Sequence, residues 1–65
     1  MKIIVNGEAL QSRAATLADL LAELGQGQAK VATAVNEDFV PAARRSAHTL
    51  REGDRVEIVA PRQGG

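Results

Sequence analysis

The residues with the most evident chemical potential are the last five, Pro61 to Gly65, which end in two consecutive glycines. Glycine has no Cβ, so Gly64 and Gly65 can adopt almost any backbone conformation and can pass through a channel too narrow for other residues. The preceding residues 55–60 alternate as a strand does. We therefore expect a rigid strand that leads into a flexible tail, residues 61–65, with the chemistry at the terminal carboxylate. The alternative is that the two glycines are an accident or a cloning remnant.

The other polar groups of the chain offer little chemistry. There is no cysteine, which excludes a disulfide framework and a thiolate nucleophile, and a single histidine, His48, cannot build a zinc cluster. Without a serine nucleophile elbow or a second histidine, we expect His48 to be structural or exposed rather than catalytic. Arg44 and Arg45 form the only basic doublet. We expect them to be solvated, the alternative being contact with an acidic or phosphate group of a partner. No bound metal or cofactor is expected.

Length and charge limit the class of protein. Sixty-five residues suffice for one small domain, which we place at residues 1–60. Eight basic and eight acidic residues cancel, so the chain lacks the one-signed field that attracts nucleic acid or anionic lipid. Phe39 is the only aromatic residue, which leaves no platform for stacking bases. No stretch resembles a signal segment or a membrane span. We expect a cytoplasmic monomer that binds proteins, and neither nucleic acid nor membranes.

The first half of the chain predicts a hairpin and a helix. Residues 2–5 are mostly β-branched, and Asn6-Gly7 is the strongest two-residue turn signal, so the next strand covers residues 8–13. A two-residue turn places Ile3, Val5 and Leu10 on the core face and Ile4 and Ala9 on the other. Thr16 then caps a helix over residues 17–24, with an acid at position 19 and a glycine after its end. Its four leucines form one stripe, which we assign to the core; the alternative is a docking face.

The second half predicts short strands. Residues 31–36 form the third strand, residues 37–38 turn the chain, and residues 39–40 form a short edge strand before Pro41. Either Phe39 or Val40 must point outward. We expect Phe39 to be buried, since a lone phenylalanine usually is, the alternative being a recognition residue on an exposed sheet face. Residues 42–50 predict a surface loop with a helical turn, and Gly53 a turn before the strand at residues 55–60.

This order of elements predicts an α+β fold. One amphipathic helix has to cover one face of a single mixed sheet of four to five strands, because nothing else can bury its leucines. The first and last strands are both rich in β-branched residues, which favours them as the parallel central pair. That arrangement is the β-grasp, or ubiquitin-like, fold.

The chain also resembles a known family over essentially its whole length, namely the sulfur carrier proteins of thiamin (thiazole) biosynthesis. The resemblance rests on five motifs that occur in order: Val5-Asn6-Gly7, Thr16-Leu17-x-x-Leu20-Leu21, Ala34-Val35-Asn36-x-x-x-Val40-Pro41, Gly53-Asp54-x-Val56-Glu57-Ile58-Val59, and Gly64-Gly65. The tail departs from the family pattern at Pro61 and Arg62, where members often carry apolar residues.

The resemblance implies a carrier rather than an enzyme. An adenylating enzyme of the E1-like class consumes ATP to convert the terminal carboxylate, here that of Gly65, into a mixed anhydride. Sulfur from a donor such as a cysteine desulfurase or another persulfide-bearing protein then gives a thiocarboxylate, which thiazole synthase uses. On this basis Gly64 and Gln63 thread the tail into the partner, and Phe39, Val40, Val59 and Arg62 bind partners.

Three alternatives remain open. The small subunit of molybdopterin synthase has the same fold and tail but is usually longer, with extra structure between the helix and the last strand. A ubiquitin-like modifier would be joined through Gly65 to lysines of target proteins. A β-grasp domain that binds RNA or regulates another protein would need no terminal Gly-Gly, and zero net charge with a single aromatic argues against RNA.

Overall fold

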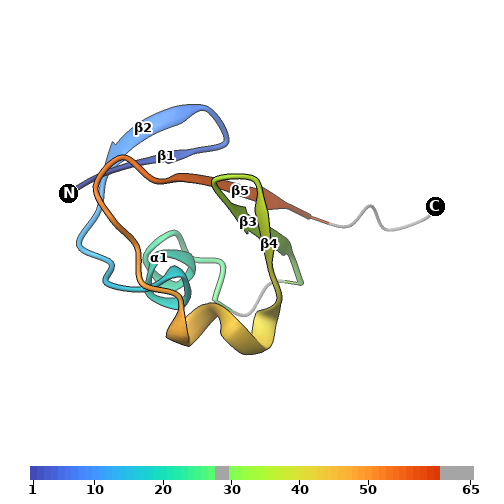
Figure 1. Cartoon of the computed structure of the whole chain (residues 1–65). Coiled ribbons are helices and arrows are strands. Elements are labelled where there is room, and N and C mark those ends of the chain that lie inside the picture. Colours follow the sequence, from blue (N-terminus) through green and yellow to red (C-terminus); the bar gives the residue numbers. More distant parts are fainter. Residues whose placement is uncertain (28–29, 61–65) are drawn as a thin grey trace.

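The computed structural model describes residues 1–27 and 30–60. These residues form a five-stranded mixed sheet, an α-helix across one of its faces and a short 3₁₀ helix (Figure 1). The strand order is β2-β1-β5-β3-β4, which confirms the predicted β-grasp arrangement. The elements are β1 (Lys2–Val5), β2 (Glu8–Gln11), α1 (Leu17–Glu23), β3 (Ala32–Val35), β4 (Asp38–Val40), η1 (Ala42–Ala47) and β5 (Arg55–Val59).

The first and last strands form the parallel pair at the centre of the sheet, as predicted. In the register, Ile4 lies opposite Arg55 and Val5 opposite Val56. β2 and β3 flank this pair and run antiparallel to β1 and β5 respectively. The last strand is therefore a central strand with a neighbour on each side, and Ala60 follows it from the middle of the sheet.

Two hairpins with two-residue turns join the outer strands to the centre. Asn6 and Gly7 have φ of 49° and 86°, and Val5 lies opposite Glu8, as the sequence predicted. In the second hairpin Asn36 and Glu37 have φ of 50° and 73°. The predicted turn at residues 37–38 was wrong by one residue, because Asn36 was assigned to the strand although asparagine tolerates the left-handed region.

The helix begins and ends where its capping residues predict. The Thr16 hydroxyl accepts a hydrogen bond from the Asp19 amide at 3.2 Å, and the Asp19 carboxylate accepts one from the Thr16 amide at 3.3 Å. Leu17, Leu20 and Leu21 are buried, which confirms that the leucine stripe is core rather than a docking face. Gly25, with φ of 77°, supplies the left-handed residue just after the helix.

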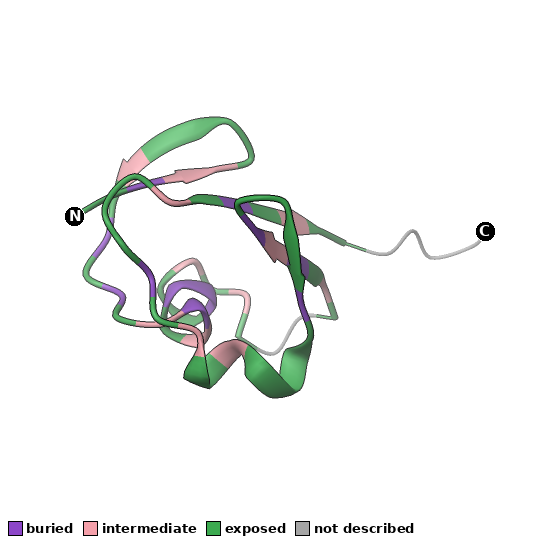
Figure 2. Cartoon of the chain, viewed as in Figure 1, coloured by how far each residue is buried: buried purple, intermediate pink, exposed green. Residues whose placement is uncertain are grey.

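The core lies between α1 and the sheet (Figure 2). Ile3 is wholly buried and Val5 and Leu10 are half-buried, which confirms the predicted core face of the first hairpin. Ala14 and Leu50 lie outside the regular elements and also join the core, a contribution that periodicity did not predict. The buried apolar residues are Ile3, Ala14, Leu17, Leu20, Leu21, Val35, Val40, Leu50 and Val56.

The predicted loop at residues 42–50 contains the 3₁₀ helix η1, and its two arginines differ. Arg44 is exposed, as expected for a solvated residue. Arg45 is half-buried; its Nε donates to Thr33 Oγ1 at 3.1 Å and its guanidinium also donates to the Val31 carbonyl. The expectation of a solvated doublet was therefore wrong for Arg45, which fastens η1 to β3. His48 is half-buried, and its carbonyl accepts from the Leu17 amide at 2.9 Å, which fits a structural position.

Candidate functional site

The sheet face that α1 leaves uncovered carries an apolar surface next to the end of β5. Phe39 lies opposite Ala34, which in turn lies opposite Glu57, and Ala32 lies opposite Val59. Because side chains alternate along a strand, these residues share the face away from the helix. We call Ala32, Ala34, Phe39 and Val59 the open-face patch.

The open-face patch is built so that its large side chains stay in solvent. Phe39 is 69% exposed and Val59 is 60% exposed. Their neighbours across the strands are alanines, too small to cover them, and a shallow depression of about 130 Å³ lies between them, beside Glu57. A second depression of about 310 Å³, lined by Lys30, Val31, Ala32 and Val59, continues the surface along the end of β5. Apolar side chains that cluster on one exposed face mark a surface for a partner.

Two of the sequence-based assignments change here. The expected burial of Phe39 is wrong, because its strand position faces the open side of the sheet. Val40 was assigned to partner binding, yet it is only 3% exposed and packs in the core, where its carbonyl accepts from the Thr33 hydroxyl at 2.7 Å. Phe39 and Val59 therefore come together on the surface, and Val40 is excluded from it.

The tail assignments lie outside the described residues. Ala60, which follows β5 directly, is exposed and is the last residue that the structure describes. Arg62, Gln63, Gly64 and Gly65 follow it in the sequence and are not described. Their assigned roles, and the tail at residues 61–65, therefore remain predictions.

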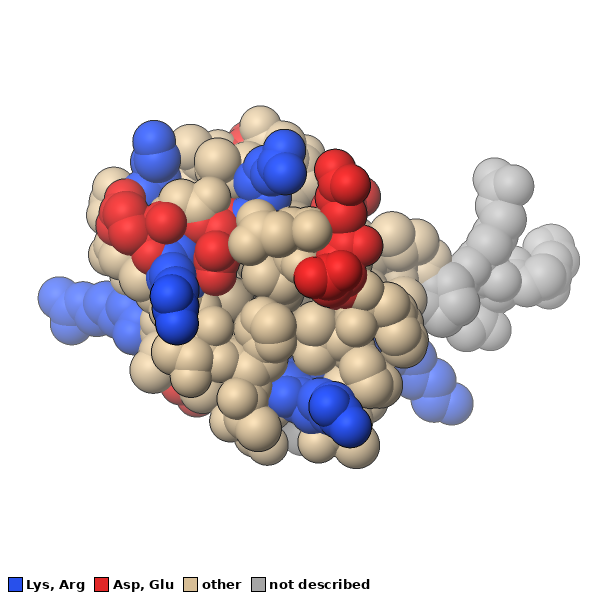
Figure 3. All heavy atoms as spheres, in the orientation of Figure 1, with Lys and Arg blue, Asp and Glu red and all other residues tan. Residues whose placement is uncertain are grey.

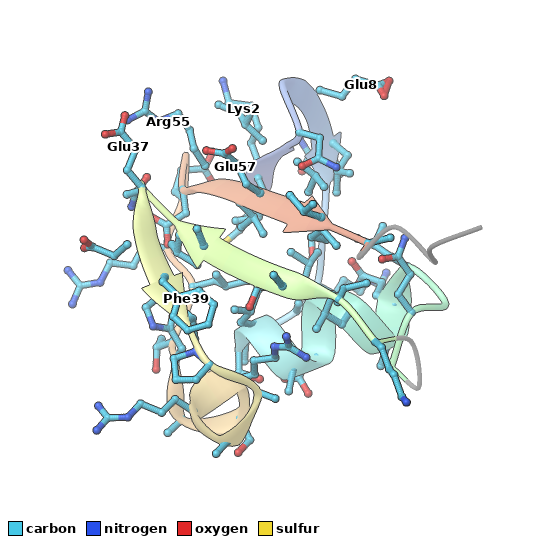
Figure 4. The ribbon with its side chains drawn as sticks, turned by 90° about the vertical axis from the view of Figure 1, so that its right-hand side faces the viewer. Lys2, Glu8, Glu37, Phe39, Arg55 and Glu57 are labelled. Carbon is cyan, nitrogen blue, oxygen red and sulfur yellow. The ribbon has the colours of Figure 1, made fainter. Side chains whose placement is uncertain are left out.

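Charged side chains of both signs lie on the face of the sheet that α1 leaves uncovered. In Figure 4, Glu57, Arg55 and Lys2 lie on the side of the sheet opposite α1, and the Phe39 side chain extends from β4. Figure 3 shows basic and acidic side chains on the same face of the molecule, with uncharged surface between them. Sequence reasoning missed Glu57 and the two alanines, although their alternation with Val59 and Phe39 was a readable signal.

Metal and membrane features are not found in the part of the chain that the structure describes. Residues 1–27 and 30–60 contain no group of three or more His, Asp or Glu side chains placed to hold a metal ion. Among these residues, neither helix is long and apolar enough to cross a membrane.

Comparison with known proteins identifies the family. The sequence model of the ThiS family matches residues 2–65. The chain belongs to the ThiS family. It is 35% identical over 66 residues to the sulfur carrier protein ThiS of Escherichia coli K12, a match that covers the whole of both chains. It is therefore a sulfur carrier of thiamine biosynthesis, a protein substrate rather than an enzyme. This family membership favours the thiamine pathway over the molybdopterin, modifier and RNA-binding alternatives.

Solved structures and a longer relative extend this result. The crystal structure of the thiamine biosynthesis protein ThiS from Geobacter metallireducens superimposes with a TM-score of 0.82 at 29% identity, covering all of both chains. A solution structure of a thiamine biosynthesis protein from the same organism gives a TM-score of 0.79 at 28% identity and is covered to 88%. A thiazole synthase of Paramagnetospirillum magneticum is 39% identical to this ThiS-family chain over 66 residues, which are 20% of that longer protein.

Proposed function

We propose that the Gly65 carboxylate is the group that carries sulfur, and that the folded domain at residues 1–60 serves to present it on the tail at residues 61–65. A carboxylate is a poor electrophile, because it is anionic and lacks a good leaving group. An ATP-dependent adenylating enzyme removes both obstacles. A carboxylate oxygen attacks the α-phosphorus of ATP, pyrophosphate leaves, and the product is an acyl adenylate.

Sulfur then enters by acyl substitution. The terminal sulfur of a persulfide on a donor protein, such as a cysteine desulfurase, attacks the Gly65 carbonyl and AMP leaves. A thiol cleaves the resulting acyl disulfide; it forms a disulfide with the donor sulfur and releases the thiocarboxylate. The sulfur of this thiocarboxylate is a soft nucleophile on a protein handle, and thiazole synthase takes it up. Two terminal glycines support this proposal, because their small size suits a narrow channel that leads to the adenylating site.

We further propose that the open-face patch is the docking surface for thiazole synthase. The observation that carries this step is the Paramagnetospirillum magneticum thiazole synthase, which contains a segment 39% identical to the whole of this chain. Covalent linkage raises the effective concentration of two modules for each other, which is useful only if the two meet during the reaction. Phe39 and Val59 expose apolar area beside the end of β5, so a partner that covers them also lies next to the start of the tail. We propose Arg62 as a further partner-binding residue.

The test of the carrier proposal is intact mass spectrometry. The wild-type chain and a variant that lacks Gly65 are incubated with ATP, the adenylating enzyme and a persulfide donor. The wild-type chain should gain the mass of one oxygen-to-sulfur exchange, confined to Gly65. The shortened chain should not react, because its carboxylate falls short by one residue, about 3.3 to 3.6 Å of extended chain. Equal reaction of both chains, or no reaction of the wild type with competent partners, would contradict the proposal.

A further inference from the structure

The Asn6 side chain makes a pair of hydrogen bonds that its role in the hairpin turn does not require. Asn6 Oδ1 accepts from the Ile58 amide at 2.9 Å, and Asn6 Nδ2 donates to the Ile58 carbonyl at 3.1 Å. Its own backbone amide donates to the Val56 carbonyl at 2.9 Å. Asn6 therefore hydrogen-bonds to β5 at Val56 through its backbone and at Ile58 through its side chain, along the same edge of the strand.

The side-chain hydrogen bonds of Asn6 take the place of the backbone hydrogen bonds that a longer β1 would make to Ile58. β1 pairs with β5 only at Ile4 and Val5, after which the chain turns into the hairpin. Without another partner, the Ile58 amide and carbonyl would have no ladder bonds on the β1 side. The Asn6 carboxamide has both a donor and an acceptor, so it extends the parallel ladder by one step. Ile58 lies two positions before Ala60, where the described part of the chain ends.

A second asparagine provides an internal comparison. Asn36 also occupies a left-handed turn position, with φ of 50°. Its Oδ1 accepts from the Arg55 amide at 3.1 Å, and its Nδ2 donates to Asp54 Oδ1 at 3.0 Å. Both hairpin turns therefore hold β5 through an asparagine side chain, but Asn36 holds its beginning and Asn6 its end. A left-handed turn position can be filled by glycine or aspartate, and neither has a carboxamide to bond both backbone groups of Ile58.

We propose that Asn6 is a positioning residue for sulfur transfer, which fixes the point at which the chain leaves the sheet. This inference rests on the proposed role of Gly65. If the Asn6 bonds are lost, residues 58 and 59 are held only by their pairing with β3, so the end of β5 frays more often. The effective concentration of a chain end falls roughly as the −3/2 power of segment length. Fraying from residue 58 lengthens the segment beyond the strand from six residues to eight, which lowers delivery of the carboxylate about 1.5-fold in the frayed state, before any loss of orientation is counted.

The experiment compares Asn6→Gly with Asn36→Gly, which removes the matching bonds at the other end of β5. Both glycines accept the left-handed turn conformation. The first readout is amide hydrogen exchange of Ile58 in the free protein. The second is the rate of thiocarboxylation as the carrier concentration is varied at fixed adenylating enzyme. Circular dichroism checks that every variant is folded at the assay temperature. Asn6→Asp, which retains the Ile58 amide bond but not the carbonyl bond, replaces Asn6→Gly if the latter fails to fold.

We expect Asn6→Gly to speed Ile58 exchange several-fold and to lower kcat about two- to tenfold. KM should stay unchanged, because the substitution leaves the rest of the domain surface as it is in the wild type. Asn36→Gly should leave kcat, KM and Ile58 exchange as in the wild type. Unchanged kcat in Asn6→Gly, or an equal loss in Asn36→Gly, would overturn the inference while the carrier proposal stands. A wild-type chain that never reacts would instead overturn the carrier proposal.

Discussion

Phe39 and Val40 are adjacent residues whose truncation should have opposite effects. Phe39 is 69% exposed on the open-face patch, whereas Val40 is 3% exposed in the core. Phe39→Ala should therefore weaken binding of thiazole synthase and leave folding almost unchanged. Val40→Ala should destabilise the fold and leave the affinity of the folded fraction unchanged.

The magnitudes follow from the exposed fractions. A phenylalanine contributes about 150 to 250 Å² when wholly buried, so at 69% exposure about 100 to 170 Å² remains for a partner to cover. At about 25 cal/mol per Å², and with allowance for the area that alanine still covers, the loss is about 2 to 3 kcal/mol. This corresponds to an increase in Kd of about 30- to 150-fold. The cost to folding should stay below about 0.5 kcal/mol, while Val40→Ala should cost about 1 to 3 kcal/mol.

Isothermal titration calorimetry with thiazole synthase measures Kd, and urea titration followed by circular dichroism measures the free energy of unfolding. Both are carried out on the wild type and the two variants. Wild-type affinity of Phe39→Ala would refute the assignment of the open-face patch to thiazole synthase. A loss of stability in Phe39→Ala as large as in Val40→Ala would show that the aromatic ring belongs to the core, which would contradict the register of β3 and β4.

Three further predictions concern stability. Leu20 is wholly buried, so Leu20→Ala should lower the free energy of unfolding by about 2 to 5 kcal/mol in a urea titration; a smaller loss than in the half-buried Leu24→Ala would contradict the core assignment. Hydrogen bonds from the Ser12 hydroxyl and the Arg13 amide hold the pKa of Glu23 below its usual range, so the contribution of Glu23 is present above its unfolded pKa and is lost as pH falls through the folded pKa. Thermal melts between about pH 5 and pH 3 should therefore fall less steeply for Glu23→Gln than for the wild type, and parallel curves would refute this coupling. Glu37 has a φ of 73°, a left-handed conformation that is strained for a residue with a Cβ but not for glycine. Glu37→Gly should therefore raise the free energy of unfolding by up to about 1 kcal/mol; a lower urea midpoint would show that the left-handed position carries no strain.

Features set by residues close in sequence could be predicted from sequence. Asn6-Gly7 determines a turn, and Thr16 with Asp19 determines a helix start, through contacts within three residues. The position of Arg45 could not be predicted in this way, because its hydrogen-bond acceptors belong to residue 33 of β3 and to residue 31 just before it, both more than ten residues away in the sequence. The hydrogen bonds between Asn6 and Ile58 could not be predicted for the same reason, since these two residues are 52 positions apart in the sequence.

The error at Phe39 has a different cause, since the sequence contained enough information to avoid it. In a two-residue hairpin turn at either 36–37 or 37–38, residue 40 pairs with an odd-numbered position of the preceding strand. It therefore shares the face of Thr33 and Val35, which are buried, and Phe39 shares the face of Ala34. The general tendency of phenylalanine to be buried was given more weight than this alternation. Alternation decides which face a strand residue occupies, and residue type decides only what that position costs.

On the proposed function, the central place of β5 lets so small a domain offer its C-terminal end to partner enzymes without losing its fold. A partner that pulls on the chain beyond Ala60 acts on a strand that is hydrogen-bonded to β3 as far as Val59 on one side and to Asn6 at Ile58 on the other. An edge strand would have only one of these ladders to resist peeling. Val56 of the same strand is also buried against the helix, so force on the tail is opposed by core packing as well as by hydrogen bonds. We therefore expect that the β5 amides at residues 56–58 exchange no faster when the tail is held by the adenylating enzyme than in the free carrier. Faster exchange of these amides in the complex would show that the enzyme breaks hydrogen bonds of β5 in order to draw out more of the chain.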